Sequence, residues 1–169
     1  MKKTRIEWAD STWNPITGCS PISDGCANCY AERIAKRFAG SAGYPADNPF
    51  GVTLHDGRIL EPLRWSKPRR IFVCSMGDLF HEDVRDEWIH QVFAAMSLAA
   101  QHTFVVLTKR PERMQRMLTA PDFEADVWFH RDSLLHSHDI PRRISQEYTY
   151  HHDDFYTHEG ALAATAYEY

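Results

Sequence analysis

Three cysteines lie close together near the start of the 169-residue chain: Cys19, Cys26 and Cys29, with the spacing C-x6-C-x2-C. Cysteine thiolate is a preferred ligand of soft and borderline metals. The short gap between Cys26 and Cys29 lets both thiols bind one centre from the start of a helix. In a reducing compartment such a group is more typical of a metal site than of a disulfide framework. We therefore expect all three cysteines to be metal ligands.

Three thiols do not decide which metal, if any, is bound. A closed structural zinc site takes four protein ligands, so zinc would need a fourth ligand such as His81. An iron–sulfur cluster with three cysteine ligands leaves one iron free to bind the amino and carboxylate groups of S-adenosylmethionine. A third alternative is that the thiols bind no metal. The remaining cysteine, Cys74, lies within an apolar run and is expected to pack in the core.

The elements that would position this group alternate along the chain. Two apolar runs, residues 71–76 and 103–108, are typical of strands buried in a parallel sheet. Apolar residues at helical spacing between them predict a helix over 84–100, and Pro111 suits the first turn of a helix over 111–118. The other predicted elements are a strand at 12–17, a helix at 26–38 and a hairpin near 55–58. This order predicts an α/β fold.

Polar residues follow each predicted strand. The cysteine loop follows the first strand, residues 75–78 follow the second, and residues 108–110 follow the third. The carboxyl ends of parallel strands carry the active site in α/β barrels, so these loops should meet. There we expect Asp78 to accept hydrogen bonds from a ribose. We expect Lys109 or Arg110 to bind the carboxylate of S-adenosylmethionine.

The composition is typical of a single globular domain, with 43% hydrophobic and 25% charged residues. No run approaches the roughly 18 apolar residues of a membrane span, and the amino terminus lacks the apolar region of a secretory signal. These features predict a cytoplasmic protein. Residues 1–120 hold 16 Lys/Arg and 13 Asp/Glu, and such a mildly basic body permits a nucleic acid partner without requiring one.

The pattern of predicted elements ends near residue 118. Residues 121–169 hold 3 Lys/Arg and 10 Asp/Glu, and the segment from 119 contains six of the ten histidines and five of the seven tyrosines. At most, residues 127–129 begin one more strand. We therefore predict an α/β domain over 1–118, followed over 119–169 by an irregular, poorly ordered, acidic tail.

Four blocks of sequence resemble, in the same order, a phage and prophage protein family known for its three-Cys motif. They are TWNPITGC (12–19), GCANCYAE (25–32), SMGDLFH (75–81) and LTKRP (107–111), so the resemblance covers about residues 5–118. The family is similar to radical SAM enzymes. The resemblance implies a [4Fe–4S] cluster on Cys19, Cys26 and Cys29, S-adenosylmethionine, an electron donor and a three-Cys-motif partner protein. For a phage-encoded protein the cytoplasm would be that of the host.

The resemblance also implies a fold and an activity. The fold would be a parallel (β/α) barrel of radical-SAM type, here incomplete, because the family's later strands and its glycine-rich GGE-like segment do not follow residue 119. We therefore expect a truncated or altered chain. The activity would be radical modification of an unknown substrate, with a nucleobase or nucleic acid as a candidate. The alternatives are a zinc-stabilised module that binds nucleic acid or protein, and an inactive remnant.

Overall fold

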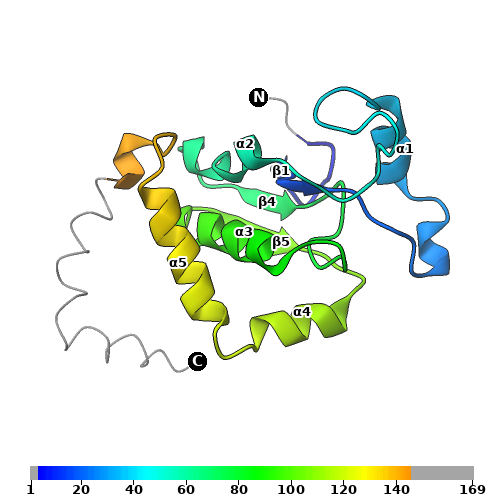
Figure 1. Ribbon diagram of the computed structural model, residues 1–169. Coiled ribbons are helices and arrows are strands. Elements are labelled where there is room, and N and C mark those ends of the chain that lie inside the picture. Colours follow the sequence, from blue (N-terminus) through cyan, green and yellow to red (C-terminus); the bar gives the residue numbers. More distant parts are fainter. Residues whose placement is uncertain (1–3, 146–169) are drawn as a thin grey trace.

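A three-stranded parallel sheet lies at the centre of the computed structural model, which describes residues 4–145. The strands are β1 (Ser11–Trp13), β4 (Arg70–Val73) and β5 (Thr103–Val106), in the spatial order β1-β4-β5 (Figure 1). Val73 pairs with Trp13 on one side and with Val106 on the other. Parallel neighbours need long crossovers, which here contain helices.

The crossover from β4 to β5 contains α3 (Asp86–Leu98), and α5 (Phe123–Leu135) packs against α3 (Figure 1). Ile89, Val92 and Leu98 of α3 are buried in the core. They recur at helical spacing, so one face of α3 is apolar. Phe123 of α5 meets Phe93 edge-on, with ring centroids 5.2 Å apart. These contacts bury the interface between the two longest helices of the described chain.

The other elements are short. They are the antiparallel pair β2 (Ile16–Thr17) and β3 (Thr53–Leu54), the helices α1 (Tyr30–Arg37), α2 (Asp56–Ile59) and α4 (Pro111–Leu118), and 3-10 turns at Asp24–Cys26 and Pro62–Arg64. No helix in residues 4–145 has the length and apolar content of a membrane span.

The expected α/β fold with a parallel sheet is confirmed. The sheet is open: among the described residues it has three strands, with β1 and β5 at its edges, and it does not close into a barrel. The radical-SAM type of barrel therefore stays a prediction. The helix expected over 111–118 has those bounds, and the one expected over 84–100 spans Asp86–Leu98.

Three local predictions are wrong. The strand expected over 12–17 is divided into β1 and β2 at Pro15, whose ring nitrogen cannot donate to a ladder. The hairpin expected near 55–58 is replaced by α2, and β3 pairs with β2 instead. The strand start expected at 127–129 lies inside α5, because packing against α3 overrides the strand preference of Val127. Of the predicted tail, residues 146–169 lie outside the described residues.

The helix predicted over 26–38 begins later, at Tyr30, because a 3-10 turn at Asp24–Cys26 and a second turn ending at Cys29 precede it. Cys26 and Cys29 therefore lie in the approach to α1, with Cys29 as its N-cap residue. The two thiols are held by turns instead of lying on one helical face.

Two glycines bring the cysteine loop against the end of β4. Gly18 and Gly77 form a parallel bridge beyond the β1–β4 ladder, and the Gly18 amide donates to the Met76 carbonyl at 2.9 Å. Gly18 has a φ of +93°, and a Cβ added to it would lie 2.1 Å from the carbonyl oxygen of Gly51. Only glycine combines this conformation with so close an approach. The residue next to Cys19 is thereby fixed to the sheet.

We expect Gly18→Ala to lower the free energy of unfolding by about 3 kcal/mol or more, since it adds both backbone strain and overlap with Gly51. Gly57→Ala is the matched control, because its Cβ would meet nothing within 4 Å. Urea unfolding of both variants checks this. Equal midpoints for Gly18→Ala and wild type would contradict the close approach.

Candidate metal and cofactor site

A cavity of about 450 Å³ lies at the carboxyl ends of β1, β4 and β5. The loops that follow β4 and β5 line it, as the sequence predicts, together with the cysteine loop, which follows β2 instead of β1. All six predicted site residues line it: Cys19, Cys26, Cys29, Asp78, Lys109 and Arg110. Phe50, Phe72 and Leu107 supply an apolar wall. The fold therefore gathers residues that are up to 91 positions apart in the sequence.

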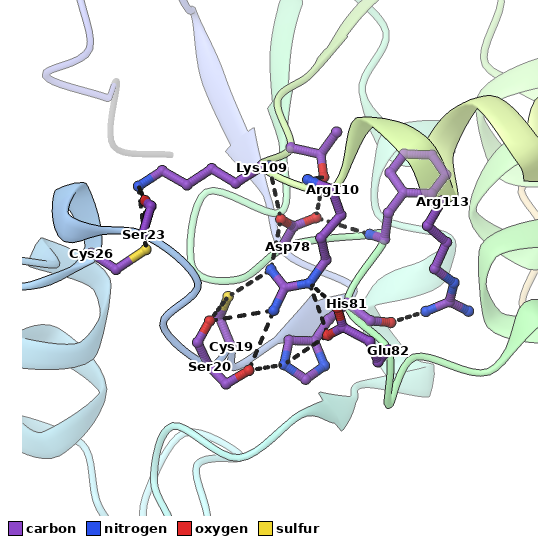
Figure 2. Close-up of polar contacts among 12 residues, drawn as sticks. Cys19, Ser20, Ser23, Cys26, Asp78, His81, Glu82, Lys109, Arg110 and Arg113 are labelled. Carbon is purple, nitrogen blue, oxygen red and sulfur yellow. Dashed lines mark hydrogen bonds and ion pairs between the residues drawn. The ribbon is translucent and has the colours of Figure 1, made fainter.

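A buried ion pair between Asp78 and Arg110 joins the loops after β4 and β5 (Figure 2). The Arg110 Nη1 donates to Asp78 Oδ2 at 3.1 Å, and the exposed fractions of the two residues are 4% and 5%. Asp78 Oδ2 also accepts from the Lys109 amide at 3.1 Å, and Oδ1 accepts from the Thr108 hydroxyl at 2.7 Å and the Phe80 amide at 3.0 Å. The carboxylate thus fixes the turn that carries Lys109 and Arg110.

Arg110 also reaches the cysteine loop. Its Nη1 donates to Cys19 Sγ at 3.5 Å, and its Nη2 lies 3.3 Å from both the carbonyl oxygen and the hydroxyl of Ser20 (Figure 2). The Nε donates to both carboxylate oxygens of Glu82, at 3.0 and 2.9 Å. A guanidinium has five N–H groups, and these contacts use all of its nitrogens. Arg110 therefore links three segments of the chain.

Cys26 lies at the other side of the site, beside Lys109 (Figure 2). Its Sγ is 3.3 Å from Lys109 Nζ and 3.6 Å from the Ser23 hydroxyl. Hydrogen bonds from the backbone of Ile22, from the side chain and backbone of Ser23, and from Lys109 lower the pKa of Cys26 to about 6. Because Cys26 is also accessible, its thiol is suited to nucleophilic reaction or metal binding at neutral pH.

Cys19 has a different environment. Burial raises the pKa of its thiol, although the hydrogen bond and the charge of Arg110 act in the opposite direction. Cys29, the N-cap residue of α1, is partly buried like the other two. The three thiols therefore approach one cavity from a loop, a 3-10 turn and the start of a helix.

The arrangement does not suit one zinc ion held by three cysteines and His81. Zinc–ligand distances of about 2.0–2.3 Å require the ligands to converge on a point. Within residues 4–145, no three His, Cys, Asp or Glu side chains are grouped closely enough to hold one ion. His81 Nδ1 accepts from the Asp83 amide at 3.1 Å, so the proton lies on Nε2, which donates to the Ser20 hydroxyl at 2.7 Å. Both ring nitrogens thus have partners in the protein.

An iron–sulfur cluster makes a different demand on its ligands. Each cysteine of such a cluster binds a different iron, so the thiols surround the group without converging on one point. Cys19, Cys26 and Cys29 line the cavity together with the buried Cys74, and Arg110 and Lys109 lie next to Cys19 and Cys26. The iron–sulfur cluster stays a prediction.

A model of the family described as "Protein of unknown function (DUF5131)" matches residues 3–146. The chain belongs to this family. The DUF5131 match includes the whole cavity and continues through α5. Searches among curated proteins and among solved structures find no match. The family description states no activity, so the resemblance to the three-Cys-motif and radical SAM proteins stays a prediction.

Four residues that sequence reasoning did not select contribute to the site of the DUF5131 chain. Ser20 and Glu82 hold Arg110. Asn14 accepts from the Ser75 hydroxyl at 3.1 Å and from the Met76 amide at 2.9 Å, and the Tyr30 hydroxyl donates to the Ser75 carbonyl at 2.5 Å. Ser20 and Tyr30 directly follow cysteines, and Asn14 lies in the TWNPITGC block, so the sequence offered a signal for these three. Glu82 offered none, because its partner Arg110 is distant in the sequence.

Cys74 packs in the core of the DUF5131 chain, as predicted. Burial raises the pKa of its thiol to about 12. Its φ of 54° begins the turn after β4, and its amide donates to the Trp13 carbonyl at 2.8 Å. Cys74 also lines the cavity, but its residue is only 2% exposed, so it is a control for the effect of a buried thiol next to the three partly exposed ones.

We expect Asp78→Asn to lower the free energy of unfolding by about 3 kcal/mol, because the substitution leaves the buried Arg110 charge poorly compensated. Glu82→Gln removes a carboxylate from the same guanidinium, but that side chain is 64% exposed. Its cost should be under about 1 kcal/mol. Chemical unfolding of the two variants checks the contrast, and similar costs would contradict the buried pair.

We expect iodoacetamide to alkylate Cys26 of the metal-free protein rapidly at pH 7, where a thiol with a pKa of about 6 is mostly thiolate. Lys109→Gln removes a group that lowers this pKa, so the midpoint of the pH–rate profile should move upward while the rate above pH 9 stays unchanged. Lys67→Gln, before the amino end of β4, is the control. Site-resolved mass spectrometry measures the rates. An unchanged midpoint in Lys109→Gln would contradict the contact.

Proposed function

We propose that this DUF5131 protein is a radical-SAM-like enzyme that holds a [4Fe–4S] cluster with Cys19, Cys26 and Cys29. The observation that carries the proposal is the arrangement of three partly exposed thiols, apart from the buried Cys74, around one cavity at the carboxyl ends of parallel strands. Three thiolates leave one iron for S-adenosylmethionine, and the bound cluster would supply the electron that cleaves it. The parallel order β1-β4-β5 agrees with part of a radical-SAM barrel.

The cavity supports a small-molecule cofactor beside the cluster. Its volume of about 450 Å³ lies within the range of ligand pockets, and its lining combines an apolar wall with a few polar groups. Phe72 and Leu107 line the cavity together with Ser75 and Thr108. An adenine ring and a charged amino-acid moiety need these two kinds of surface.

Lys109 is the residue that we assign to the carboxylate of S-adenosylmethionine. Its ammonium group is exposed at the cavity beside Cys26, where it can pair with a second anion. The guanidinium of Arg110 is already held by Asp78, Glu82 and Ser20. The ribose contact of Asp78 stays a prediction, since both of its oxygens also accept hydrogen bonds within the protein.

The substrate class that we propose is a nucleobase or nucleic acid, as the resemblance implies. The proposal requires an external electron donor, and the three-Cys-motif partner protein is a candidate partner. The competing function is that of a zinc-stabilised, non-catalytic module that binds nucleic acid or protein. The metal content of the purified protein distinguishes the enzyme from the binding module.

We expect anaerobically reconstituted wild-type protein to bind four irons and four sulfides per chain and to show the brown colour of a cluster. Alanine at Cys19, Cys26 or Cys29 should remove most of the iron, whereas Cys74→Ala should retain it. Addition of S-adenosylmethionine should change the EPR signal of the reduced wild-type protein. Iron and sulfide analysis of the five proteins makes the test.

A colourless protein with one zinc per chain would contradict the proposal and favour the binding module. Equal iron content in Cys74→Ala and in all three loop variants would also refute it, because the iron would then be bound elsewhere.

A further inference from the structure

We propose that Arg110 is a positioning residue that fixes the thiolate of Cys19 and, through its N–H···S hydrogen bond, raises the reduction potential of the cluster. The inference rests on the proposed function, since it concerns a ligand of the same cluster. It assigns to Arg110 a role toward the sulfur instead of the carboxylate of S-adenosylmethionine.

The contacts of Arg110 fix its guanidinium in one position. Arg110 is 4% exposed, and two carboxylates bind different nitrogens of its planar fork: Asp78 at Nη1 and Glu82 at Nε. Such multidentate contacts fix the orientation of the group as well as its charge. The remaining N–H groups must therefore point toward the cysteine loop.

These N–H groups of Arg110 hold Cys19 and the residue that follows it. Nη1 meets the sulfur at 3.5 Å, and Nη2 meets the backbone and hydroxyl of Ser20 at 3.3 Å. The Ser20 hydroxyl also accepts from His81 at 2.7 Å, and the Cys19 amide donates to the Phe50 carbonyl at 3.1 Å. Together with the bridge between Gly18 and Gly77, these contacts hold the loop on both sides of Cys19.

The hydrogen bond from Arg110 should change the electronic properties of the Cys19 sulfur. Reduction adds negative charge to an iron–sulfur cluster, and hydrogen bonds to its sulfurs favour that reduced form. Salt screens the buried guanidinium of Arg110 little, whereas Lys109 beside Cys26 is exposed to solvent and salt. Because Asp78 and Glu82 offset part of the Arg110 charge, its effect on the potential comes chiefly through the N–H···S hydrogen bond to Cys19.

Two variants move the potential in opposite directions. Arg110→Lys keeps a charge for Asp78 but loses the fork, so the reduction potential should shift to a more negative value. Glu82→Gln leaves more of the guanidinium charge uncompensated, so the potential should shift to a more positive value. The matched controls are Arg113→Lys, whose native side chain binds His81, Val84 and Asp86, and Asp83→Asn, a 79% exposed neighbour of Glu82.

The measurement is an EPR-monitored redox titration of reconstituted proteins with equal iron and sulfide content. Opposite shifts for Arg110→Lys and Glu82→Gln, with controls like wild type, are the expected result. If Arg110→Lys does not fold, the comparison of Glu82→Gln with Asp83→Asn tests the inference, and the reduction potential of Glu82→Gln should be the more positive of the two. Potentials equal to wild type in the variants overturn the inference while the cluster stands. Absence of a cluster from wild type instead defeats the proposed function, and this inference with it.

Discussion

The buried ion pair of Asp78 and Arg110 is the interaction on which the rest of the site depends. Removing two charges from water costs several kcal/mol per ion, and mutual attraction offsets that cost only when further hydrogen bonds satisfy both groups. Here Asp78 accepts from Thr108 and two backbone amides, and Arg110 donates to Glu82 and to the cysteine loop. One salt bridge therefore connects the ends of β4 and β5 with the segment after β2.

The parallel sheet brings Asp78 and Arg110 together, and their ion pair gives Cys19 an environment different from that of Cys26. Parallel strands bring their carboxyl ends to one edge, and Gly18 and Gly77 let the cysteine loop approach that edge closely. Cys19 then lies against a buried cation, whereas Cys26 lies against an exposed one.

The sequence was sufficient for the parallel sheet and for the meeting of the predicted residues, because apolar runs and strand-end loops are local signals. It was insufficient where tertiary contacts decide. Pro15 divides a predicted strand, and α5 replaces a predicted strand start because α3 offers it an apolar face. From the sequence, Asp78 and Arg110 are predicted to contact a ligand, whereas the structure pairs them with each other. Residue types alone cannot reveal a partner 32 positions away.

The central claim is that three thiolates of this chain hold a cluster with one open iron. Mössbauer spectroscopy of the ⁵⁷Fe-reconstituted protein, with and without S-adenosylmethionine, tests it most directly. The predicted result is that one iron of the four changes its spectrum on addition while the other three do not. A spectrum in which no iron responds, from a protein that holds a full cluster, would contradict the open site.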